Sequence, residues 1–139
     1  MSSKNNILLN DWQLLSVSQF ADVVTGGTPK TSVMEYWENG NVPWLPSGDL
    51  KFNRIKNAHR FITEYGLKNS SAKLMPVNTV LIAMTGATLG RVGLLDFEAS
   101  ANQSVTGILP NSHSVPEFLF YFLWSSYYKI LSEAGGSAQ

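Results

Sequence analysis

Basic side chains are concentrated in one segment of the chain, residues 51–73. This segment holds six of the ten lysine and arginine residues and one acidic residue, Glu64, so its formal charge is +5 and that of the rest is −5. Lysine and arginine neutralise phosphates and read guanine, and the asparagines between them can read adenine. The alternative to a nucleic-acid contact is that this segment is simply a solvated polar surface segment over the core. The candidate contact residues of this basic segment are Lys51, Arg54, Lys56, Arg60, Lys68, Ser70 and Lys73.

Two further polar sites allow more than one interpretation. Arg91 follows two glycines in a predicted turn, where it can contact a phosphate or form an ion pair with Asp96 or Glu98. Asn102 and Gln103 have side chains that can hydrogen-bond to a base edge, but their place before a predicted strand favours an ordinary turn.

No arrangement of residues typical of a catalytic or metal centre is recognised. The chain has no cysteine, and neither His59 nor His113 has another ligand at metal-binding spacing. The glycine-rich stretch 86–91 differs from a phosphate-binding loop, because only three residues separate its glycines and Arg-Val follows where Lys-Ser/Thr is required. We therefore predict no catalytic residue, no metal site and no cofactor.

Length and composition indicate one folded domain. A chain of 139 residues with 44% hydrophobic and 14% charged residues is sufficient for a single core and is unlike a disordered protein. We expect a ragged N-terminus over residues 1–11 and one domain over residues 12–139. The most apolar run, 118–124, is far shorter than the roughly 20 residues that span a bilayer. With no targeting segment recognised, we expect a cytoplasmic protein without membrane contact.

The elements that must position these residues follow from hydrophobic pattern and turn chemistry. Apolar runs at 79–85 and 92–95 predict a hairpin-like pair, and residues 104–109 predict a third strand. Residues 42–46 contain two prolines, which predicts an edge strand or an ordered loop. Residues 51–62 are polar and show little alternation.

Two short helices are predicted in the first half of the chain. One extends through Phe20 and Val23 and ends at Gly26–Gly27, because glycine tolerates the left-handed conformation that ends helices. The other is a single turn that begins after Thr63 and is broken at Gly66.

The clearest element is a C-terminal helix over residues 115–134. Ser114 and Glu117 have the spacing of a capping box, Pro116 lies in the first turn, and Gly135–Gly136 supply a stop. Strands followed by a terminal helix predict the α+β class, as a single domain with a mixed β-sheet, short helices and a C-terminal α-helix.

Short motifs recur in a characteristic order along the chain. They are TGGTP at 25–29, YW at 36–37, VPWLPSGDL at 42–50, ITEYGL at 62–67, SSAKLMP at 70–76, TGATLGR at 85–91, NQS at 102–104 and GGSAQ at 135–139. In this order, from about Trp12 to Gln139, the chain resembles a target recognition domain of the type I restriction–modification specificity (S) subunit.

This resemblance implies a DNA-reading module without catalysis. Each such domain reads one half of a bipartite duplex site. Conserved helices of the subunit dock methyltransferase (M) subunits, which use S-adenosylmethionine to methylate adenine, and the assembly recruits the restriction (R) subunit. The resemblance adds weight to the basic segment as a DNA face, and it adds Lys30, Thr31 and Ser32, in the loop after Pro29, as secondary candidates.

The sequence also departs from the family's pattern, because the family continues into a helical segment and a second recognition domain beyond the position of Gln139. We therefore expect either a fragment of a longer subunit or a truncated half-subunit. A second hypothesis is a protein-interaction scaffold that uses an aromatic flank of the C-terminal helix, formed by Tyr121, Trp124, Tyr127 and Tyr128.

Overall fold

The computed structural model describes the backbone of residues 21–138 and the side chains of residues 21–134. Its larger sheet has five strands in the order β1, β8, β5, β6, β3. Their bounds are Val23–Thr25, Val105–Ile108, Val80–Ala83, Val92–Leu95 and Asn53–Ile55. Strand β3 runs parallel to β6, and the other neighbours are antiparallel. The predicted mixed sheet, the hairpin and the third strand are therefore confirmed.

A smaller sheet has three strands in the order β4, β2, β7. They span Phe61–Ile62, Val42–Leu45 and Ser100–Ala101, and the short helices η1 (Met34–Tyr36), η2 (Ser47–Asp49) and α3 (Glu64–Lys68) lie between strands. The prediction of an edge strand or loop at 42–46 is wrong, because β2 is the central strand. Its two halves pair separately, Val42 and Pro43 with β4, and Trp44 and Leu45 with β7.

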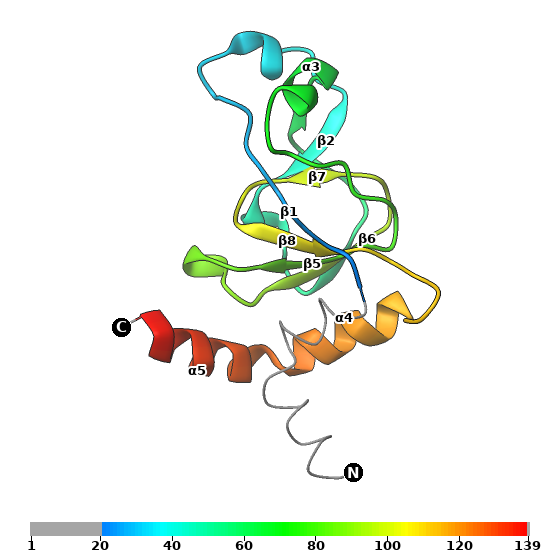
Figure 1. Ribbon diagram of the computed structural model, residues 1–139, viewed down its shortest axis with the longest axis vertical. Helices are drawn as coiled ribbons and strands as arrows, with labels where there is room; N and C mark the ends of the chain where they lie inside the picture. Colours follow the sequence, from blue (N-terminus) through cyan, green and yellow to red (C-terminus); the bar gives the residue numbers. More distant parts are fainter. Residues whose placement is uncertain (1–20, 139) are drawn as a thin grey trace.

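The domain is built in layers on the five-stranded sheet (Figure 1), with the small sheet on one side and helices α4 (Pro116–Ser125) and α5 (Tyr127–Ala138) on the other. Side chains of β5 alternate between the two sides, so that Val80 and Ile82 pack with Leu119 of α4. Leu81 joins a second core cluster with Leu45 of the small sheet. Because both faces are covered, all four residues of β5 are buried, and the strand is a continuous apolar run in the sequence.

The predicted single C-terminal helix is two helices, separated at Ser126. The hydroxyl groups of Ser125 and Ser126 both donate to the Phe122 carbonyl, at 2.7 and 2.9 Å, and such bonds bend helices. The predicted stop is also wrong, because α5 continues through Gly135 and Gly136 to Ala138.

The capping box predicted at the start of this helix does not form. Val115 occupies the N-cap position without a side-chain cap, and Pro116 is the first helical residue. The Ser114 hydroxyl instead donates to Asn111 Oδ1 at 3.3 Å. The spacing of Ser114 and Glu117 was therefore misleading, because each side chain has a partner outside the first turn.

The short helix predicted to end at Gly26–Gly27 is also corrected. Residues 23–25 form β1 and not the end of a helix, since Val23, Val24 and Thr25 are β-branched and pair with β8. The earlier part of that predicted helix, up to Phe20, lies outside the described residues. So do the predicted ragged terminus and Trp12. The polar stretch 51–62 contains β3 and β4.

Helix α3 begins as predicted but is not broken by its glycine. Thr63 caps it, accepting from the Gly66 amide at 2.9 Å. The helix then continues through Gly66, where an added Cβ would lie 2.7 Å from the Tyr36 carbonyl oxygen. Glycine is thus required here for close packing against η1 and not for ending the helix.

Candidate nucleic-acid interface

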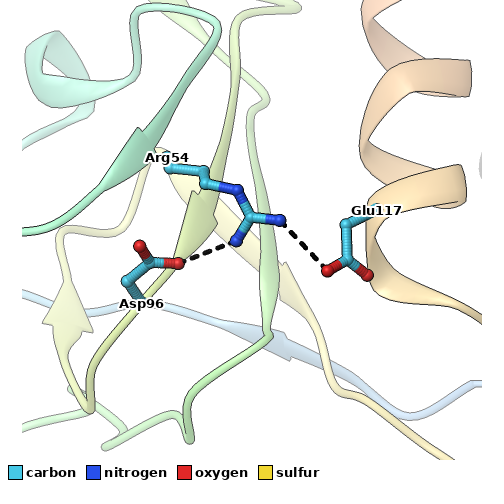
Figure 2. A network of polar contacts seen from close by, with 3 residues as sticks. All are labelled: Arg54, Asp96 and Glu117. Atoms are coloured by element: carbon cyan, nitrogen blue, oxygen red, sulfur yellow. Dashed lines mark hydrogen bonds and ion pairs between the residues drawn. The ribbon is translucent and has the colours of Figure 1, made fainter.

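Among the described residues, the basic segment forms two ion pairs, and Arg54 takes part in both. Its guanidinium lies 3.0 Å from Asp96 Oδ1 and 3.0 Å from Glu117 Oε2 (Figure 2). Asp96 directly follows β6, and Glu117 lies in the first turn of α4. The three residues therefore tie the edge strand β3 to the strand beside it and to the covering helix.

These contacts change the acidities of two of the groups. Hydrogen bonding to Glu117, and then to Asp96, raises the pKa of Arg54 above its ordinary value. The pKa of Glu117 is lowered, first by a hydrogen bond from its own backbone N–H and then by Arg54. Both shifts favour the charged forms of Arg54 and Glu117, which stabilises the ion pair between them.

Beside this network, β3 and its flanking residues form a polar pocket of about 260 Å³. Lys51 and Lys56 contribute exposed cations to it, whereas the charge of Arg54 is already met by two carboxylates. Asn53 Oδ1 accepts from the Lys51 amide at 2.8 Å, which fixes the turn into the strand. The pocket is lined by Asp49, Lys51, Asn53, Arg54, Ile55, Lys56, Asn57 and His59.

Arg60 lies apart from this pocket, over two tryptophan rings of the small sheet's core. Its guanidinium carbon is 5.1 Å from the Trp37 ring centroid and 4.8 Å from that of Trp44. The indole N–H groups of Trp44 and Trp37 donate to the carbonyls of Gly27 and Lys30, at 2.9 and 3.2 Å. Arg60 and the two rings thus support the loop formed by residues 26–32, which we call the anchored loop.

The anchored loop carries Lys30, Thr31 and Ser32, all exposed. It packs closely on the segment 70–73, because an added Cβ at Gly27 would lie 2.5 Å from the Ala72 amide nitrogen. The fold therefore brings the start of the anchored loop against the segment that carries Ser70 and Lys73, about 40 positions away in sequence. Lys68, at the end of α3, precedes this segment.

Arg91 lies at the end of the β5–β6 hairpin and meets the start of β3. The Phe52 amide donates to the Val92 carbonyl at 2.9 Å. Because β3 and β6 run parallel, the residues that precede these two, Lys51 and Arg91, lie side by side where the two strands begin. Neither predicted ion pair of Arg91 forms; within the described residues, Asp96 is bonded to Arg54 instead. The predicted cations thus belong to two regions, one around the anchored loop and one along β3.

A hydrogen bond joins Thr28 of the anchored loop to Gln103, one of the two amide residues for which the sequence favoured an ordinary turn. The Thr28 hydroxyl donates to Gln103 Oε1, although the residues are 75 positions apart. Gln103 lies in the turn before β8, and the next residue, Ser104, accepts from the Thr85 hydroxyl at 2.8 Å. The sequence indicated a turn at 102–103, but no local pattern could associate that turn with Thr28.

Across residues 21–138, no three His, Cys, Asp or Glu side chains gather where they could hold a metal ion. In the same range, no helix combines the length and apolarity needed to cross a membrane.

The chain is similar to known proteins of one family. The family model of the type I restriction modification DNA specificity domain matches residues 10–139. The chain is 32% identical over 134 residues to the type I restriction enzyme MjaIX specificity subunit of Methanocaldococcus jannaschii, covering 91% of this chain and 30% of that protein. It is 30% identical over 118 residues to the EcoR124I/EcoR124II specificity subunit of Escherichia coli, covering 81% and 29%.

The fold has a similar counterpart among solved structures. The crystal structure of the HsdS subunit from Thermoanaerobacter tengcongensis matches with a TM-score of 0.62 and 16% identity, covering 82% of this chain and 27% of that one. The chain thus spans less than a third of the length of these relatives. Since the family model accounts for nearly all of its residues, the chain belongs to the type I restriction modification DNA specificity domain family.

Proposed function

We propose that this chain is a sequence-specific duplex DNA recognition domain that reads one half of a bipartite site within a longer specificity subunit. The observation that carries the proposal is the family match over residues 10–139. The segregation of charge supports it, because a neutral chain with a +5 segment can neutralise phosphates locally.

The contacts of each cation suggest a division of roles. The exposed lysines of the basic segment and of the anchored loop, together with Arg91, serve as phosphate contacts, and Thr31, Ser32 and Ser70 supply hydroxyl donors among them. Arg54 and Arg60 have a mainly structural role in this surface. Arg54 is bonded to two carboxylates, and the guanidinium of Arg60 covers two tryptophan rings. The phosphate-contacting lysines are Lys30, Lys51, Lys56, Lys68 and Lys73.

In this proposal the domain itself performs no catalysis and acts in the cytoplasm. Adenine methylation and DNA cleavage belong to methyltransferase and restriction subunits that the complete specificity subunit brings to the site. Support comes from the names of the relatives, which are specificity subunits of type I restriction enzymes.

The test is fluorescence anisotropy with a labelled random-sequence duplex at several salt concentrations. A variant with Lys51, Lys56, Lys68 and Lys73 changed to Glu is compared with Lys129→Glu, a charge reversal on α5. We expect the unsubstituted chain to bind with a Kd of about 10⁻⁴–10⁻⁶ M, falling in affinity with salt. The fourfold variant should lose binding, and Lys129→Glu should retain most of it.

Circular dichroism must show that both variants are folded before the comparison is made. Absence of binding by the unsubstituted folded chain at low salt would contradict the proposed function. Equal losses in the fourfold variant and in Lys129→Glu would contradict the placement of the DNA face, although not DNA binding itself.

A further inference from the structure

Three polar loops meet at one end of the five-stranded sheet. The anchored loop follows β1, the turn 102–104 precedes β8, and the hairpin connection 84–91 follows β5. The strand register places them together, because Thr25 is opposite Thr106 and Ala83 is opposite Val105. This end of the sheet therefore presents side chains from three distant parts of the sequence.

The anchored loop is locked onto the turn at 102–104 by its backbone. The Gly26 amide donates to the Val105 carbonyl at 2.8 Å, and the Gly27 amide donates to the Ala101 carbonyl at 2.9 Å. An added Cβ at Gly26 would lie 2.1 Å from the Asn102 carbonyl oxygen, so the two backbones leave no space for a side chain. Side chains carried by the loop and the turn are thus presented from a rigid base.

Within the turn, the two amide side chains differ in what they contact. Asn102 is half-buried, and its Oδ1 accepts from the Ser104 amide at 3.1 Å, which closes the turn. Gln103 is exposed, and its Oε1 accepts from the Thr28 hydroxyl. Within residues 21–138, the structure shows no acceptor for the two N–H bonds of Gln103 Nε2. An oriented donor therefore faces solvent.

Resting on the proposed function, we propose that Gln103, positioned by Thr28, donates a hydrogen bond from its side-chain amide to an acceptor atom of DNA. The surrounding groups match a polyanion with many acceptors: exposed Lys30 lies on the same loop, and exposed Thr85 bonds the neighbouring Ser104. Phosphate oxygens and base edges both offer such acceptors, and glutamine is suited to either.

The experiment measures the DNA affinity of the full chain and the sequences it selects from a randomised duplex library. Gln103→Ala removes the amide, and Gln103→Glu keeps the oxygen that Thr28 bonds but replaces the donor with a negative charge. Thr28→Val keeps the shape of the positioning residue without its hydroxyl. Ser112→Ala is the control, since Ser112 is an exposed polar residue in the turn after β8, at the other end of that strand.

For a phosphate contact, we expect Gln103→Ala to weaken binding to every duplex by about 2- to 10-fold, with unchanged selection. For a base contact, we expect selection to relax at one position, by roughly 5- to 150-fold in discrimination. In either case Gln103→Glu should weaken binding more than Gln103→Ala, Thr28→Val should reproduce part of the loss, and Ser112→Ala should change nothing.

Unchanged affinity and selection in both Gln103 variants, with the unsubstituted chain binding normally, would overturn the inference while leaving the proposed function intact. A chain that does not bind DNA at all would instead contradict the proposed function, and the inference would fall with it.

Discussion

The guanidinium of Arg54 lies 3.0 Å from the carboxylate of Glu117, although the two residues are 63 positions apart. The contact joins strand β3 to helix α4 across the edge of the sheet (Figure 2). An arginine that the charge pattern predicts as a DNA contact thus has two carboxylate partners within its own domain. Net charge along a segment identifies where cations are, but their partners come from elsewhere in the chain.

Stability should depend on pH through Glu117. Its pKa is lowered in the folded protein, so the ion pair contributes fully above the ordinary glutamate value of about 4.3 and is lost as the pH falls through the lowered value. We expect Glu117→Gln to lower the Tm at pH 7 and to have little effect on the Tm well below pH 4. A Tm difference that is constant over this range, measured by calorimetry at several pH values, would contradict a role for this carboxylate.

Substitutions at Arg54 and Lys73 should have different effects, the first on stability and the second on DNA binding. Arg54→Ala removes two ion pairs, so we expect a lower Tm with the salt dependence of DNA binding little changed. Lys73 is exposed, so Lys73→Ala should change stability by no more than about 0.5 kcal/mol. It should reduce the slope of log K against log salt by about 0.9. Thermal melts and salt titrations of both variants test this prediction. A smaller salt slope in Arg54→Ala and a lower Tm in Lys73→Ala would contradict it, because Arg54 would then be the DNA contact and Lys73 the structural residue.

Gly26→Ala should be strongly destabilising. The new Cβ would lie 2.1 Å from the Asn102 carbonyl oxygen and 2.4 Å from that of Ala101, so the anchored loop must move away from the backbone of residues 101–102. We expect a loss of about 3 kcal/mol or more, measured by urea denaturation. The matched control is Gly48→Ala, where an added Cβ meets nothing within 4 Å. Similar losses at both glycines would show that close backbone approach is not the reason for Gly26.

Trp44→Phe should loosen the anchored loop from inside the domain. Trp44 is 3% exposed, and its indole N–H donates to the Gly27 carbonyl at 2.9 Å. Phenylalanine leaves that buried carbonyl without this donor, at a cost of about 1–3 kcal/mol. Hydrogen exchange of the Gly27 and Thr28 amides should become faster, and DNA affinity should fall with it.

The half-buried Trp37 supplies the comparison for this prediction. Its bond to the Lys30 carbonyl is exposed, so Trp37→Phe should cost less stability than Trp44→Phe. If the two variants were equally stable and exchanged equally, the buried indole bond would not be what holds the loop.

The central strands, the start of α3, the segregation of charge and the family motifs could all be predicted from local sequence patterns. Strands β5 and β6 are recognisable because both faces of the sheet are covered there, which makes their residues a continuous buried run without polar side chains. Strand β8 is recognisable by the same pattern, interrupted at the half-buried Thr106. The Thr63 cap is equally local, since its partner is three residues away. Such features depend on residues close together in the chain, so they can be predicted from local sequence patterns.

The remaining features depend on contacts between segments that are far apart in the sequence. Strands β3, β4 and β7 are two or three residues long and exist because a distant strand pairs with them. The partners of Arg54 are 42 and 63 positions away, and Thr28 meets Gln103 across 75. The same holds for Gly26, whose lack of a side chain is required by the Asn102 carbonyl and not by a helix end. Each of these contacts forms when the folded sheet brings separate segments together, and no local pattern encodes which segments meet.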